Sequence, residues 1–106
     1  MIAKFLDLST AYITKKDAKI LEAMASGEPV SKGYPFPRII NHEYGWFVNV
    51  QLEAEIFTDY LLGCCDAGMS KPFLRLFKHA KNCECVWINL DQDGPRDLKG
   101  FRTFTW

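Results

Sequence analysis

Apolar and polar residues alternate near the start of the chain, and the apolar positions then change to helical spacing. Residues 2–8 are predicted to form a strand, because the alternation places Ile2, Leu6 and Leu8 on one face and Phe5 on the other.

A helix is expected next, because both of its ends carry recognisable signals. Thr14 is a good N-cap, and Asp17, three positions later, favours the positive end of the helix dipole. Ser26 and Gly27 end the helix with a residue that tolerates positive φ. The helical face that would meet the core carries Ala18, Leu21, Met24 and Ala25.

A loop and a hairpin follow this helix. Residues 28–37 contain three prolines and a glycine, so they are predicted to form a surface loop. Residues 38–43 and 45–52 are rich in strand-forming residues and predict an antiparallel hairpin. In its second strand, Trp46, Val48, Val50 and Leu52 alternate with Phe47, Asn49 and Gln51.

Two helices and two strands are predicted for the rest of the chain. Residues 53–67 have helical spacing, although Gly63 weakens the helix. Ser70 caps a second helix, whose core stripe consists of Phe73, Leu76, Phe77 and Ala80. Residues 85–90 and 101–106 are predicted strands, and the last of them would carry Phe104 and Trp106 on one face.

The predicted element order is β-α-β-β-α-α-β-β, which favours an α+β fold. We expect a two-layer sandwich in which a mostly antiparallel sheet of four to five strands carries two or three helices on one face. Since no repeat or linker interrupts the pattern, residues 1–106 are expected to form a single domain.

Charge and hydropathy argue against nucleic-acid-binding, membrane and exported proteins. The 106 residues include 13 basic and 13 acidic side chains, so the formal net charge is 0 and no global field attracts nucleic acid or an anionic membrane. No apolar run approaches the roughly 20 residues of a spanning helix. The N-terminal residues lack the features of a signal peptide. These observations predict a cytoplasmic protein with no membrane partner.

The four cysteines raise the question of a thiol or metal site. We expect free thiols, because nothing in the sequence indicates export. Cys83 and Cys85 with His79 form a candidate zinc set, but the spacing within the cysteine pair is tighter than in ordinary zinc sites. A thiol-dependent enzyme, using Cys83 or Cys85 with His42 or His79, is a second alternative. The sequence contains no complete catalytic set, and we predict no catalytic residue, metal or cofactor.

A third alternative is a nucleic-acid binder. Lys71, Arg75, Lys78 and Lys81 lie away from the core stripe of their helix, where they could meet phosphates. On a neutral chain such a strip is more often the solvated side of the helix. We therefore disfavour nucleic acid as the partner.

Aromatic residues exceed expectation, at 14% of the chain. Both faces of the predicted sheet carry some of them, since Phe47 lies opposite Trp46, and Trp87 lies opposite Val86 and Ile88. Helices on one face alone would leave Phe47 or Trp87 near solvent, where clustered aromatic rings mark a binding surface. The alternative is that the loop of residues 28–37 covers this second face.

Several short segments, kept in order, resemble a small uncharacterised bacterial family, a domain of unknown function found on plasmids and integrated mobile elements. The resemblance rests on residues 5–14, 42–48, 83–95 and 104–106. It implies no known catalytic activity and suggests an accessory role in a mobile element's dealings with its host, such as blocking a defence protein.

We therefore interpret the chain as a non-enzymatic protein-interaction module. The expected partner is an unidentified protein of the host or of the element, and a homodimer is a further alternative. The aromatic content and the hairpin of residues 42–48 lead us to predict Tyr44, Trp46 and Trp87 as contact residues.

Overall fold

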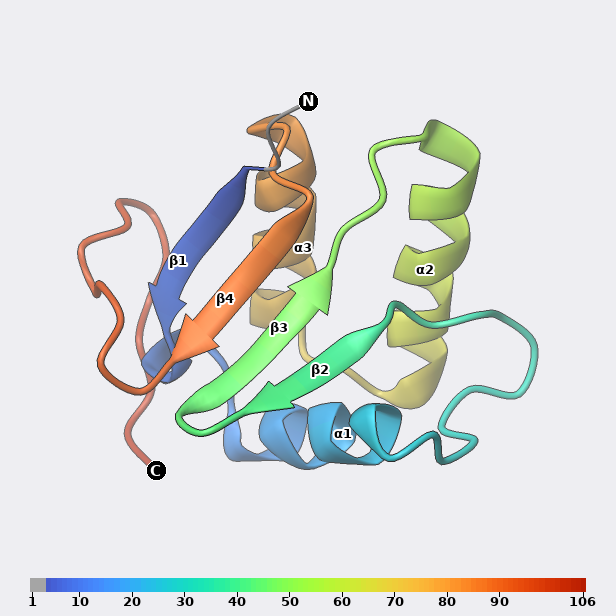
Figure 1. Ribbon diagram of the computed structural model, residues 1–106, viewed down its shortest axis with the longest axis horizontal. Helices are drawn as coiled ribbons and strands as arrows, with labels where there is room; N and C mark the ends of the chain where they lie inside the picture. The colour runs from blue at the N-terminus through green and yellow to red at the C-terminus, as the bar shows by residue number, and fades with distance from the viewer. Residues whose placement is uncertain (1–3) are drawn as a thin grey trace.

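The computed structural model describes residues 4–106, which form a four-stranded sheet with three helices packed on one face (Figure 1). The strands are β1 (Phe5–Ser9), β2 (Ile39–His42), β3 (Gly45–Asn49) and β4 (Trp87–Asp91). The helices are α1 (Lys15–Ala25), α2 (Ala54–Ala67) and α3 (Lys71–Asn82), and a short 3-10 turn, η1 (Thr10–Tyr12), follows β1. The predicted α+β class is confirmed, while Ile2 of the first predicted strand lies outside the described residues.

The sheet has the order β1-β4-β3-β2. β1 and β4 are parallel neighbours, whereas β4 with β3 and β3 with β2 are antiparallel, so the sheet is mixed. β4 follows α3 in the chain. Its residue Trp87 pairs with Phe5 of β1 on one side and with Asn49 of β3 on the other. The last strand of the chain therefore lies between β1 and the β2–β3 hairpin.

The predicted start of α1 is confirmed and also anchors a second helix. The Thr14 hydroxyl accepts a bond from the Asp17 N–H, and the Asp17 carboxylate accepts one from the Thr14 N–H, which completes a capping box. The same carboxylate, which is fully buried, also accepts bonds from the N–H and the hydroxyl of Ser70, the N-cap of α3. One side chain therefore joins the beginnings of α1 and α3.

The core lies between the helices and the helical face of the sheet. Its largest fully buried side chains include Tyr12, Leu21, Phe73, Phe77 and Ile88. Phe57 of α2 stacks on Phe77 of α3 with ring centroids 5.1 Å apart, so the two helices pack against each other. No helix within residues 4–106 has both the length and the apolar character needed to cross a membrane.

The predicted strand at residues 101–106 is wrong. Within the described chain this segment has no strand pairing and instead lies against η1 and the residue that follows it. Two bonds hold it there, Phe104 N–H to Ala11 O at 2.6 Å and Trp106 Nε1–H to Ile13 O at 2.9 Å, and just before the segment Leu98 N–H donates to Tyr12 Oη at 2.7 Å. A 3-10 turn presents no extended row of backbone groups, so no ladder can form along it.

The proline-rich loop of residues 28–37 lies against α2. The Asp66 carboxylate accepts bonds from the Ser31 hydroxyl at 3.0 Å and the Lys32 N–H at 2.7 Å. Gly63 allows the loop to approach closely, because a Cβ at this position would lie 1.9 Å from the carbonyl oxygen of Pro35. Since the loop is held on α2 (Figure 1), it does not cover the second face of the sheet.

Candidate functional site

The face of the sheet that the helices leave uncovered carries three aromatic rings, and Figure 1 is viewed from this side. Phe5 on β1 and Trp87 on β4 stack with centroids 6.4 Å apart and an interplanar angle of 14°. Phe47 on β3 meets both rings edge to face, 6.0 Å from Phe5 and 6.4 Å from Trp87. Such offset and edge-to-face pairs are the favoured arrangements of aromatic rings.

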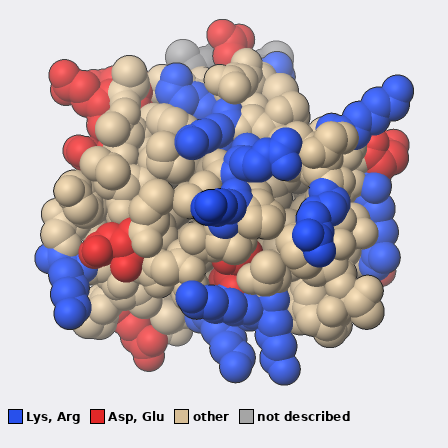
Figure 2. All heavy atoms as spheres, turned by 180° about the vertical axis from the view of Figure 1, so that it is seen from behind, with Lys and Arg blue, Asp and Glu red and all other residues tan. Residues whose placement is uncertain are grey.

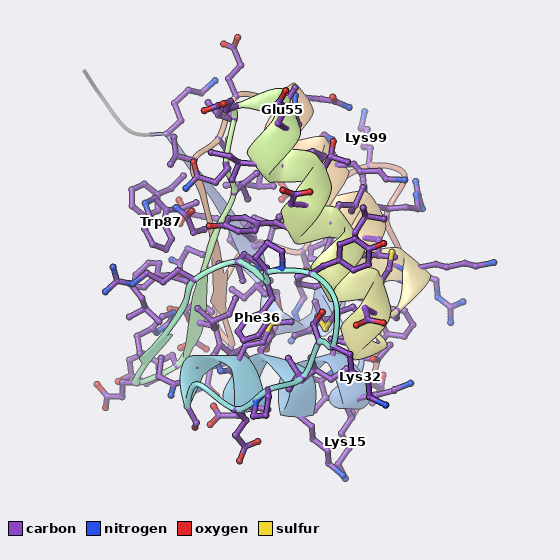
Figure 3. All side chains as sticks on the ribbon, turned by 90° about the vertical axis from the view of Figure 1, so that its right-hand side faces the viewer. Lys15, Lys32, Phe36, Glu55, Trp87 and Lys99 are labelled. Atoms are coloured by element: carbon purple, nitrogen blue, oxygen red, sulfur yellow. The ribbon has the colours of Figure 1, made fainter. Side chains whose placement is uncertain are left out.

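The rings border a shallow apolar hollow. It has a volume of about 240 Å³ and is lined by Phe5, Ile40, Phe47 and Trp87. Phe5 is 48% exposed and Ile40 38%, whereas Phe47 and Trp87 are half-buried. Figure 3 shows Trp87 on the side of the sheet away from the helices. We refer to these four residues as the aromatic patch.

A chain of hydrogen bonds runs across the sheet beside the aromatic patch. The Asn89 side-chain N–H donates to the Asp7 carboxylate at 3.0 Å, and the Asn89 oxygen lies 2.9 Å from His42 Nε2. His42 Nδ1 accepts the Tyr44 N–H at 3.2 Å. Because a backbone N–H can only donate, the neutral imidazole must carry its proton on Nε2, where it donates to Asn89. The imidazole also contacts Phe47, with centroids 4.7 Å apart.

The three predicted contact residues lie in different places. Trp87 belongs to the aromatic patch, but Trp46 faces the helical side, where its indole N–H donates to Glu22 at 2.9 Å. Tyr44 lies in the β2–β3 turn and is 45% exposed. Tyr44 and Trp46 border a separate hollow of about 300 Å³. The structure therefore does not join these two residues to Trp87.

Sequence reasoning missed Phe5 and Ile40 as members of the patch. The signal for Phe5 was present, because the alternation in β1 already placed it opposite Leu6 and Leu8. Finding Ile40 required the register of β2, in which Ile40 pairs with Phe47. A hairpin predicted from residue types alone does not fix that register.

The thiols do not converge on a common site. Burial, followed by the nearby Cys65 and Asp17, raises the pKa of Cys64 to about 12, and burial likewise raises the pKa of Cys85. Within residues 4–106, no group of three or more His, Cys, Asp or Glu side chains could hold a metal ion. Cys83, Cys85 and His79 are therefore not gathered as a ligand set. His42 bonds to Asn89 rather than to a thiol, whereas His79 Nε2 lies 3.6 Å from Cys83 Sγ.

Several basic side chains gather on the opposite, helical side of the molecule (Figure 2). Figure 2, which shows the helical side, has Lys and Arg gathered over its middle. Lys71, Arg75 and Lys78 are exposed along α3, while Arg75 covers the Phe101 ring at 4.6 Å and Lys81 the Phe57 ring at 5.2 Å. The basic strip and the aromatic patch are therefore separate surfaces.

Comparison with known proteins identifies a family. Residues 5–106 match the C-terminal domain of DUF5983, a family of unknown function. The chain belongs to this family. The match extends over β1 to β4 and the closing segment, so the DUF5983 domain includes the whole aromatic patch. No curated protein and no solved structure matches the chain significantly.

Proposed function

We propose that this DUF5983 domain is a non-enzymatic module that binds a partner protein through the aromatic patch. The observation that carries the proposal is the uncovered sheet face, where Phe5, Ile40, Phe47 and Trp87 enclose an apolar hollow of about 240 Å³. Small-molecule sites are usually larger, about 300–1,000 Å³. A shallower, almost purely apolar hollow suits a single anchoring side chain of a protein partner.

The size of the patch favours a reversible complex over a permanent dimer. Aromatic side chains bury about 150–250 Å² each when fully covered. Four side chains that are already partly buried therefore present at most a few hundred Å². A stable interface buries roughly 800 Å² on each partner. The patch matches the size of an interface centre, and we propose a second protein, rather than a second copy of the chain, as its occupant.

The polar chain beside the patch would orient the partner. Asp7, Asn89 and His42 satisfy one another, so they stay in place without a ligand. An anchor entering among the rings would meet fixed polar groups along one edge of the hollow. Fixed polar groups next to an apolar centre give an interface its specificity, because a partner that covers the Asp7 carboxylate without offering it a further donor loses affinity.

The source of the partner is a further part of the proposal. The resemblance of residues 5–14 and 83–95 to proteins of mobile elements supports a protein of the host or of such an element, met in the cytoplasm. The genes that neighbour this one test that context. A gene neighbourhood made up of ordinary chromosomal genes in several genomes would contradict it.

The binding proposal is tested with two matched variants. Phe5 is 48% exposed within the patch, and Tyr34 is 45% exposed in the loop held on α2. Proteins recovered from source-cell lysate by the wild type are compared with those recovered by Phe5→Ala and by Tyr34→Ala. The partner is then purified and its affinity is measured by calorimetry.

We expect Phe5→Ala to weaken binding about thirtyfold or more, since truncation of a central aromatic anchor costs 2 kcal/mol or more. Tyr34→Ala should leave binding within about twofold. Equal affinity for both variants would overturn the proposal. Binding of single-stranded oligonucleotide at the patch, with no protein partner that depends on Phe5, would overturn it as well.

A further inference from the structure

The four thiols of the chain differ in their surroundings, and one of them stands apart. Cys64 is fully buried, with a pKa raised to about 12, and Cys85 is also buried. Cys65 is exposed on α2, whereas Cys83 is partly exposed at the end of α3. Cys83 Sγ lies 3.6 Å from the Nε2 atom of His79, within the range of a sulfur hydrogen bond.

The end of α3 holds this thiol and imidazole together. Cys83 is the C-cap of the helix, and its N–H donates to the His79 carbonyl at 3.0 Å, so the two side chains are one helical turn apart. The imidazole also contacts the Phe101 ring, with centroids 5.1 Å apart. Packing on Phe101 restricts the imidazole and keeps Nε2 near the sulfur.

A cation lies at the backbone of Cys83. The Lys4 ammonium donates to the Cys83 carbonyl oxygen at 2.8 Å, and its charge opposes the burial that raises the pKa of the neighbouring Cys85 thiol. Thiolates form most readily beside an imidazole or an ammonium group. At Cys83 the imidazole of His79 lies next to the sulfur, whereas the Lys4 ammonium is bonded to the backbone carbonyl.

We propose that Cys83 is a modification site that takes small disulfides, with His79 as its general base. His79 Nε2 accepts the thiol proton as Cys83 Sγ attacks one sulfur of the disulfide. The S–S bond of the reagent breaks, a new S–S bond forms to Cys83, and the leaving thiolate takes the proton from the imidazolium. The products are a mixed disulfide at Cys83 and one small thiol, so sulfur, protons and electrons balance.

This inference does not depend on the binding proposal, because it concerns the end of α3 rather than the aromatic patch. Its test uses glutathione disulfide on the native protein, with mass spectrometry reporting the modified fraction of each cysteine over time. Cys65, which is exposed, is the internal reference for rate. Cys64, which is fully buried, is the internal check that the fold stays intact.

We expect Cys83 to react at least about threefold faster than Cys65 near neutral pH, although Cys65 is the more exposed thiol. His79→Gln should lower the Cys83 rate to within about twofold of the Cys65 rate, while Cys64 stays unmodified. As the matched control, Cys65→Ser should leave the Cys83 rate unchanged.

Two results would overturn the proposal. In the wild type, a Cys83 rate equal to or below that of Cys65 would show that the imidazole gives no assistance, and this measurement needs no variant to fold. An undiminished Cys83 rate in folded His79→Gln would show that His79 is not the base.

Discussion

At the residue scale, Asp17 stabilises the beginnings of two helices and not only the one that it caps. Its buried carboxylate accepts bonds from Thr14 N–H and from both the N–H and the hydroxyl of Ser70. We predict that Asp17→Asn destabilises the domain by about 2–4 kcal/mol, because one amide N–H₂ group must then face a donor in a fully buried site. Urea denaturation measures the loss. Asp59→Asn, at an exposed position of α2, should stay within about 0.5 kcal/mol of the wild type, and equal stability of the two variants would contradict this role.

Asp66 provides a pH-dependent attachment for the loop of residues 28–37. The Lys32 N–H, followed by the Ser31 hydroxyl, lowers the pKa of the Asp66 carboxyl below its ordinary value of 3.8. A lowered pKa in the folded protein means that the attachment is complete above that ordinary value. It is lost as the pH falls through the lower, folded value. We predict that the Lys32 amide signal in NMR changes in that acidic range, and that Asp66→Asn removes the change. A change that persists in Asp66→Asn would assign it to another group.

Local signals at this scale could be predicted from the sequence, whereas their long-range partners could not. Thr14 and Asp17 are three positions apart, so the N-cap of α1 follows from local spacing, although Asp17 is one methylene shorter than the usual Glu of a capping box. The bond from Ser70 to Asp17 joins residues 53 positions apart, and no local pattern encodes it. The same limit applies to the polar chain at His42, whose partner Asn89 becomes a neighbour only when β3 and β4 pair.

At the element scale, Gly63 shows how a residue that weakens a helix can be required by what packs on it. Alanine there would add about 1 kcal/mol of helix propensity. Its Cβ would lie 1.9 Å from the carbonyl oxygen of Pro35, so the loop backbone would have to move. We predict that Gly63→Ala destabilises the domain by about 1–2 kcal/mol net, as overpacking outweighs propensity. Gly33→Ala has free space around its Cβ and should be close to neutral in the same thermal melts. A stabilised Gly63→Ala would mean that the loop yields without cost.

Alternation predicted the faces of the strands well, but not the use of the final aromatic residues. Phe47 and Trp87 were placed on the second face by period-two spacing alone, and the structure leaves that face uncovered. Phe104 and Trp106 have the same spacing, yet their segment is not a strand. The indole of Trp106 instead donates to the Ile13 carbonyl. Spacing defines which side chains share a face, whereas a strand also needs a neighbour with extended backbone.

At the scale of the whole molecule, a net charge of 0 conceals two unlike surfaces. The uncovered sheet face offers the aromatic rings of the patch, whereas α3 carries the exposed cations Lys71, Arg75 and Lys78. Basic side chains gather on the helical side that Figure 2 shows. One of these cations already makes contacts within the fold, since Arg75 covers the Phe101 ring and donates to the Gly100 carbonyl. Binding at the aromatic patch and binding at the α3 cations should therefore respond differently to salt.

We predict that binding of the protein partner is insensitive to the loss of the α3 cations. In the triple variant Lys71→Gln, Arg75→Gln, Lys78→Gln, affinity should stay within about twofold of the wild type, because an apolar anchor needs no ion pairs. Affinity should also change little with salt. If α3 instead bound single-stranded nucleic acid through these three cations, log K would fall against log salt with a slope of about −2. Calorimetric titrations at several salt concentrations measure this slope. A slope of about −2 that the triple variant abolishes would contradict binding at the sheet face and would assign binding to α3 instead.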